Sequence, residues 1–193
     1  METQTFGYSM KRAIQMPIVL LLAIFVLACP RMSQAATAGE INHDVDGALQ
    51  ALYQTVPAAK NLAGVAKGIL VFPNIIKGGL GIGAQYGEGA LRENGKTTGY
   101  YKTMSASYGL QAGVQTFGYA LFFIDDESLA YLKKSKGWEL GVGPSVVIVD
   151  KGAATSLTTS TIKKGIYAFI FKQKGLMAGV GIQGSKITQI TPD

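Results

Sequence analysis

KGILVFPNIIKGGLGIGAQYGEGAL, residues 67–91, decides the fold of this chain of 193 residues. Aliphatic and aromatic residues alternate with glycine along it, a pattern typical of strands rather than helices. Similar stretches continue toward the C-terminus, and the sequence ENGK at 93–96 is a turn signal that predicts a hairpin. We therefore expect residues 68–193 to form a mostly antiparallel, strongly coiled, glycine-rich β-sheet that is barrel- or sandwich-like.

Several glycines in this region recur two residues apart, as in Gly79, Gly81 and Gly83, and again in Gly87 and Gly89. Residues two apart lie on one face of a strand. A strand face without side chains lets the sheet coil strongly, lets another element approach closely, or gives a ligand access to backbone amides. Packing and coiling is the interpretation that we favour.

Helical patterns come before the β-rich region and once inside it. Residues 37–56 predict an amphipathic helix, because TAGE at its start has capping-box spacing and apolar residues recur every three or four positions. A second short helix is expected over 58–67. A third is expected near 126–134, where acids begin the segment and lysines end it, as the helix dipole favours. The fold class is therefore α+β, with a helical segment at 36–67 before the β-rich body.

Residues 1–35 have the features of a signal peptide. The positively charged pair KR precedes an apolar run at 17–29, and SQA ending at Ala35 supplies a small-residue cleavage pattern. The apolar run is too short to span a membrane, which takes about 20 residues. A chain beginning at Met10 would have a well-proportioned signal, so we expect Met10 to be the true start.

Cys29, the only cysteine, lies at the end of this apolar run. Its context VLAC partly resembles a lipobox, in which the thiol would be acylated; the alternative is removal with the signal peptide. Cleavage after Ala35 takes away three of the 18 basic and one of the 12 acidic residues, leaving a net charge of about +4. We expect a periplasmic, peripherally membrane-associated protein, either processed at Ala35 or lipid-anchored through Cys29.

Catalytic and metal-binding patterns are weak in this sequence. His43 is the only histidine, the acidic residues form no evident pair, and the hydroxyl-rich stretch at 155–161 has no base beside it. The glycine-rich stretch at 77–89 lacks the Gly-Lys-Ser/Thr ending of a phosphate-binding loop. We therefore predict no enzyme, no cofactor, no metal site and no nucleic-acid partner.

Lysines bracket the apolar strands. Lys67 and Lys77 flank GILVFPNII. Lys163 and Lys164 precede GIYAFIF, and Lys172 and Lys174 follow it. Apolar strands bounded by ammonium groups suit an interface with anionic headgroups, where each lysine contributes about 1 kcal/mol. Of these lysines, four are our candidate headgroup-binding residues: Lys67, Lys77, Lys163 and Lys164. The alternative for each of them is a solubilising fringe on an edge strand.

The predicted helix at 37–56 is a second candidate surface. Its apolar stripe consists of Ile41, Val45, Leu49 and Leu52. An amphipathic helix can lay such a stripe on a membrane. It can equally pack the stripe on the sheet, and the sequence leaves both open.

The stretch at 67–91 resembles the SYLF family, and the likeness continues through 99–124, 137–152 and 156–188. These motifs occur in the family's order and cover nearly all of the chain after the signal, in the short bacterial exported form. The resemblance implies binding of phosphoinositides and other anionic phospholipids, through an amphipathic N-terminal segment and basic residues. Yeast-type relatives also bind actin, which is not an expected partner of an exported bacterial protein.

The function that these features favour is non-catalytic binding of anionic phospholipids at a membrane surface of the bacterial envelope. Two alternatives stay open. One is a structural or stress-related envelope protein whose main partner is another protein. The other is a small outer-membrane β-barrel, which the export signal, the alternating strands and aromatics such as Tyr100 and Phe123 favour.

Overall fold

The computed structural model describes residues 36–135, 137–139, 143–149, 162–175 and 185–193. Residues Ala36–Asp193 form a compact unit that is separate from residues 1–35. Two hydrophobic clusters are formed by residues from Ala36 onward. This unit therefore carries its own hydrophobic core, which is what a domain needs to fold on its own.

Helix α2 (Ala38–Thr55) begins with the predicted capping box. The Thr37 backbone N–H donates to the Glu40 carboxylate at 2.8 Å, and the Glu40 backbone N–H donates to the Thr37 hydroxyl at 3.3 Å. These two bonds satisfy backbone donors that the first turn leaves free. The start of the helix therefore follows from local sequence alone.

Helices α3 (Pro57–Ala63) and α4 (Asp126–Lys134) are the other two helices of the described residues. Pro57 occupies the first turn of α3, where its missing N–H does no harm. The helix ends before Gly64, so the predicted second helix at 58–67 was too long at its C-terminal end. The prediction for 126–134 is confirmed, with acids in the first turn of α4 and lysines in the last.

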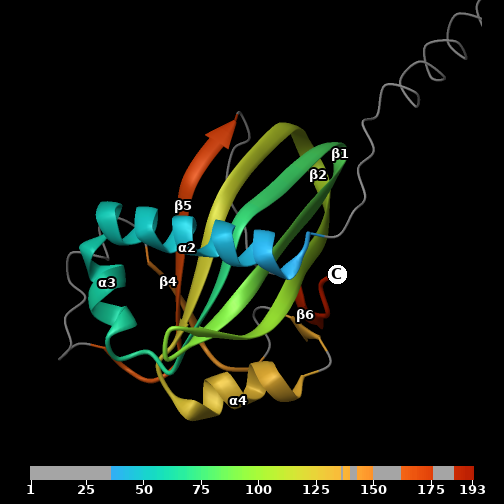
Figure 1. The fold of residues 1–193 in the computed structure, drawn as a ribbon. Helices are drawn as coiled ribbons and strands as arrows, with labels where there is room; N and C mark the ends of the chain where they lie inside the picture. The colour runs from blue at the N-terminus through green and yellow to red at the C-terminus, as the bar shows by residue number, and fades with distance from the viewer. Residues whose placement is uncertain (1–35, 136, 140–142, 150–161, 176–184) are drawn as a thin grey trace, which may run out of the picture. The chain divides into compact units, whose positions relative to one another are not determined.

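Strands β1 (Gly68–Glu93) and β2 (Lys96–Phe123) form one long antiparallel hairpin. Asn94 and Gly95 form the predicted turn, with φ angles of 50° and 76°. Both angles are positive, as a two-residue turn of the favoured handedness requires. The hairpin curves strongly along its length (Figure 1).

The remaining strands extend this hairpin into a single sheet with the order β3-β6-β2-β5-β4, while β1 pairs with the other edge of β2. They are β3 (Trp138–Glu139), β4 (Val146–Val149), β5 (Ile166–Gly175) and β6 (Lys186–Ile190). Among the described strands, only β4 and β5 pair in parallel. The expected α+β fold with a mostly antiparallel, strongly coiled sheet is therefore confirmed.

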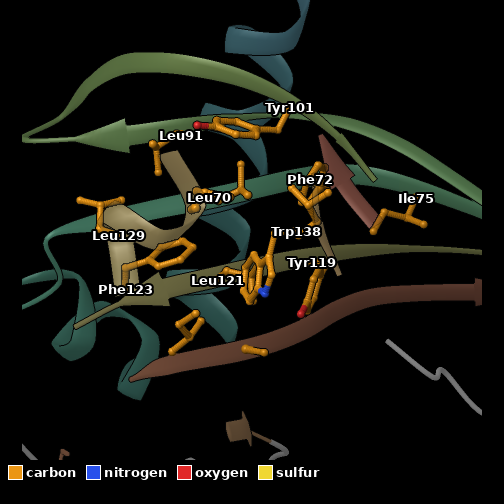
Figure 2. Close-up of a cluster of buried hydrophobic side chains, with 14 of the residues drawn as sticks. Leu70, Phe72, Ile75, Leu91, Tyr101, Tyr119, Leu121, Phe123, Leu129 and Trp138 are labelled. Carbon is orange, nitrogen blue, oxygen red and sulfur yellow. The ribbon is translucent and has the colours of Figure 1, made fainter. Parts of the chain in front are cut away.

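Each face of the sheet has its own hydrophobic cluster. Residues of α2 and α3 cover one face, packing on Ile69, Val71, Ala120 and Phe122. On the other face Trp138 lies among the side chains of the inner cluster (Figure 2). The two leucines that α4 buries join this inner cluster. Both faces of the hairpin are buried at 69–72 and 119–123, and these segments are accordingly apolar on both sides.

Glycines let two segments of the curved strand β1 approach each other closely. A Cβ atom on Gly89 would lie 2.0 Å from the carbonyl oxygen of Val71, and one on Gly79 would lie 2.5 Å from the Cα atom of Gly83. Both distances are far below van der Waals contact, so any side chain there would push the backbone apart. Packing and coiling, rather than an open ligand cradle, therefore explains these glycines.

Candidate functional site

Three of the four predicted lysines lie at one end of the sheet. Gly68, Phe123 and Ile166 are neighbours across β1, β2 and β5. Lys67 immediately precedes Gly68, and its backbone N–H donates to the Phe123 carbonyl at 2.7 Å. Lys163 and Lys164 come just before β5, so strand pairing brings all three lysines to the same end.

Lys77 lies at the opposite end. It is ten residues along β1 from Lys67, which corresponds to about 30 Å in an extended strand. Its neighbour on β2 is Gln115, which pairs on its other side with Gly175, so Lys77 lies close to Lys172 and Lys174 of β5. The four predicted lysines therefore belong to two separate groups.

The charges of these lysines are mostly uncompensated. Within the described part of the chain, the salt bridges are Arg92–Asp46 and Lys133–Glu93. Lys164 is an exception among the candidates, because its charge acts on Asp125. Of the described acids, none lies within ion-pair distance of Lys67, Lys77 or Lys163.

Asp125 joins α4 to the start of β5. It accepts hydrogen bonds from the backbone N–H groups of Ser128, at 2.8 Å, and Gly165, at 2.6 Å. Desolvation acts to raise the pKa of Asp125, but these bonds, the Ser128 hydroxyl and the charge of Lys164 outweigh it, so the pKa lies below its ordinary 3.8. The carboxylate therefore has a structural role as the helix cap.

A cavity of about 380 Å³ lies beside this cap. Its lining includes Asp125 and Glu127 as well as Lys164, together with Tyr131 and Ser145. Two carboxylates facing one ammonium group make the cavity a poor site for a phosphate. The lysines at this end can attract an anionic surface, but this pocket does not select an anionic headgroup.

The apolar stripe of α2 is packed on the sheet. Ile41 is 3% exposed and Val45 and Leu52 are fully buried, while Leu49 is partly buried against the same cluster. In this conformation the stripe supports the core, which is one of the two outcomes that the sequence left open. A membrane contact through it would require α2 to leave the sheet, and stays a prediction.

A second cavity, of about 420 Å³, lies between α2, α3 and the β1–β2 turn. Leu49, Tyr53 and Arg92 contribute to its walls. The Arg92 guanidinium already donates to the Asp46 carboxylate and to the Asn42 carbonyl. The charge of Arg92 is therefore already neutralised in the cavity wall. Burial raises the pKa of Tyr53, which also lines the cavity.

Side chains of the types that bind metal ions are scattered over the described residues. No set of three or more His, Cys, Asp or Glu side chains there could hold a metal ion. His43 lies on the exposed side of α2. No helix in the described ranges is long and apolar enough to cross a bilayer. Cys29 and the hydroxyl-rich stretch at 155–161 lie outside the described residues.

Comparison with known proteins adds one match. The family model Ysc84, described as a Las17-binding protein actin regulator, matches residues 104–191. The matched segment runs from within β2 to the end of β6 and includes Lys163 and Lys164, whereas Lys67, Lys77 and α2 precede it. No curated protein matches the sequence.

Proposed function

Because this chain belongs to the SYLF family, of which the Ysc84 model is the signature, we propose that it binds anionic phospholipids at a membrane surface without catalysing a reaction. Family membership supports a binding domain rather than an enzyme. It is equally compatible with lipid binding and with actin-related binding. The choice of lipid therefore rests on the charges of this particular chain.

The observation that carries the proposal is the set of uncompensated lysines. Lys67, Lys77 and Lys163 make no salt bridge within the described residues, so their full charge is available to a ligand. Each lysine near an anionic bilayer contributes about 1 kcal/mol, and the attraction extends over a Debye length of about 8–10 Å. Several lysines together give reversible binding without a deep headgroup pocket.

We also propose that the protein acts in the bacterial envelope. The signal-peptide pattern of residues 1–35 supports export. Mass spectrometry of the N-terminus of the protein isolated from cells tests this. A free Ala36 would indicate cleavage, an acylated Cys29 would indicate a lipoprotein, and an intact N-terminus would contradict the proposal.

Co-sedimentation with liposomes tests lipid binding. Residues 36–193 are mixed with neutral vesicles and with vesicles of increasing phosphatidylglycerol content, at low and high salt. We expect binding that requires the anionic lipid and weakens with salt. The Lys163→Glu/Lys164→Glu variant is expected to bind more weakly.

A matched control variant separates the effect of which lysines are changed from the effect of the net charge. Lys60→Glu/Lys96→Glu changes the charge by the same amount at two exposed lysines that are not among the four candidates. If both double variants lose affinity equally, net charge rather than the predicted lysines governs binding. Absence of binding to every vesicle would contradict the proposed function.

A protein ligand is the second candidate, because the matching family model is described by a protein partner and by actin regulation. Crosslinking in intact cells followed by isolation of the protein tests it. A saturable protein partner, together with no binding to pure liposomes, would favour this candidate.

A further inference from the structure

The hairpin of β1 and β2 has a sharp corner at its bend. Close approach of Gly79 to Gly83 reverses the direction of β1, and the strand pairing shifts between Leu80 and Ile82. Figure 1 shows this bend beside the end of β5, at the opposite end of the sheet from α4. We call it the corner, comprising residues 76–82 of β1, 112–116 of β2 and 172–175 of β5.

The corner exposes large apolar side chains. Leu80 is 84% exposed, Ile82 68%, Val114 62% and Ile76 49%. Leu80, Ile82 and Val114 are the three most exposed large hydrophobic residues of the described chain. A contiguous apolar patch of this kind on a protein surface marks a contact site rather than a random scatter.

This patch continues the face of the sheet that α2 and α3 cover elsewhere. Val71 lies under those helices. The bulge after Phe72 leaves Ile75 in the inner cluster and so turns Ile76 to the helix-covered face. Cross-strand neighbours share a face, so the pairs Ile76–Thr116 and Gly78–Val114 lie there as well. Past the part of this face that α2 and α3 cover, no other described residue covers it.

The charged side chains of the corner are all positive. The corner segments contain Lys77, Lys172 and Lys174 and no acidic residue. The stretches 69–87, 103–124 and 166–192 contain no Asp or Glu at all. The opposite end of the sheet differs, because Asp125 and Glu127 lie there beside Lys164.

Strand pairing places Lys174 on the face of the apolar patch, whereas Lys77 follows Ile76 in β1 and lies on the other face. Thr116 lies between Ile76 of β1 and Lys174 of β5, and Gln115 lies between Lys77 and Gly175. Val114 sits next to this row, with its Cγ2 atom 3.7 Å from where a Cβ on Gly78 would be. An apolar centre with ammonium groups around it matches a bilayer interface, where apolar side chains enter the acyl region and lysines reach the headgroups.

We propose that the corner is the part of this protein that enters an anionic lipid bilayer, with Leu80, Ile82 and Val114 in the acyl region and Lys77, Lys172 and Lys174 on the headgroups. This inference rests on the proposed function and names its site. It differs from a membrane contact through α2, because the corner is exposed in the folded protein and needs no helix to leave the core.

Paired variants test the two components of the site. In co-sedimentation of residues 36–193 with phosphatidylcholine–phosphatidylglycerol vesicles, Leu80→Ser/Ile82→Ser is expected to bind about tenfold more weakly or worse at every salt concentration. Substituting Lys77, Lys172 and Lys174 by Gln is expected to weaken binding about fivefold per lysine at low salt, with less effect at high salt. Val147→Ser/Ile148→Ser is the matched control, because these residues of β4 are also exposed, at 46% and 51%.

A site-specific probe locates the contact directly. Residues 36–193 contain no cysteine, so single-cysteine variants can carry an environment-sensitive fluorophore. On adding anionic vesicles we expect a blue shift, and quenching by brominated lipid, at Leu80→Cys. We expect neither at Gln50→Cys on α2 nor at Glu127→Cys on α4, both of which are exposed.

The outcomes separate the two proposals. If the unmodified protein binds no vesicle, the proposed function fails and the corner site fails with it. If it binds but the corner variants bind equally well, or the probe shifts at position 50 or 127 instead of 80, lipid binding stands and the corner inference is wrong. If Leu80→Ser/Ile82→Ser changes the oligomeric state in sedimentation and leaves vesicle binding intact, the patch joins copies of the chain, which also overturns the inference.

Discussion

Gly89→Ala probes the close approach of β1 to itself. The added Cβ would lie 2.0 Å from the Val71 carbonyl oxygen, whereas ordinary contact begins at 3.4 Å, so backbone atoms must move by about 1.4 Å. Val71 is fully buried within a strand, which leaves little freedom for that movement. Overpacking of a core usually costs about 1–3 kcal/mol, and a clash with backbone should lie at or above the top of that range.

The assay is urea and thermal unfolding of residues 36–193, followed through the fluorescence of Trp138, the only tryptophan, which is 1% exposed. For a domain of this size each kcal/mol shifts the melting temperature by about 2–4 °C, so we expect a loss of about 6–12 °C. Gly47→Ala is the matched control, because a Cβ there meets nothing within 4 Å. In the interior of α2 it should stabilise the protein by about 0.5–1 kcal/mol.

The structure requires that Gly89→Ala lowers the free energy of unfolding and that Gly47→Ala raises it. A Gly89→Ala variant that unfolds at the same urea concentration as the parent protein would show that β1 does not approach itself as described. Equal losses in both variants would show that alanine destabilises this protein for a reason unrelated to the curled sheet.

Three further predictions concern the helices. Leu52→Ala should destabilise the protein by about 2–5 kcal/mol in urea unfolding because Leu52 is fully buried, whereas Leu80→Ala should change stability by less than about 0.5 kcal/mol; equal losses would contradict the burial of the α2 stripe. Thr37→Ala removes the capping box and should cost about 1 kcal/mol in the same assay, and no loss would show that the cap is not formed in solution. The lowered pKa of Asp125 means that its ionised form stabilises the fold above pH 3.8 and that this stabilisation is lost as the pH falls through the folded-state pKa. Asp125→Asn should therefore have a flatter acid unfolding curve, and an unchanged curve would exclude this carboxylate from the acid transition.

The helix starts and the central turn could be predicted because their causes are local. The capping box of Thr37 and Glu40, the charge distribution along α4 and the Asn94-Gly95 turn each depend on residues a few positions apart. The end of α3 was predicted less well. Its last residues had helical composition, but the helix stops before Gly64 so that the chain can enter β1.

Local sequence did not reveal how the lysines group in space. Lys67 and Lys77 bracket one apolar run and were expected to act together, yet an extended strand separates them by about 30 Å. Lys172 and Lys174 also bracket an apolar strand in the sequence but are not among the four candidates, although strand pairing places them near Lys77. The absence of acidic residues from the stretches at 69–87, 103–124 and 166–192 is the sequence signal that could have found them.

The sequence alone was sufficient to establish the α+β class, the helix starts, the long glycine-rich hairpin and the family resemblance. These features depend on periodicity and turn chemistry, which act over a few residues. The tertiary structure decided which apolar residues are covered. Leu52 on α2 and Leu80 on β1 are equally hydrophobic, yet one is fully buried and the other is 84% exposed. Burial depends on strand register and on the reach of helices over the sheet, which are set by contacts between distant residues.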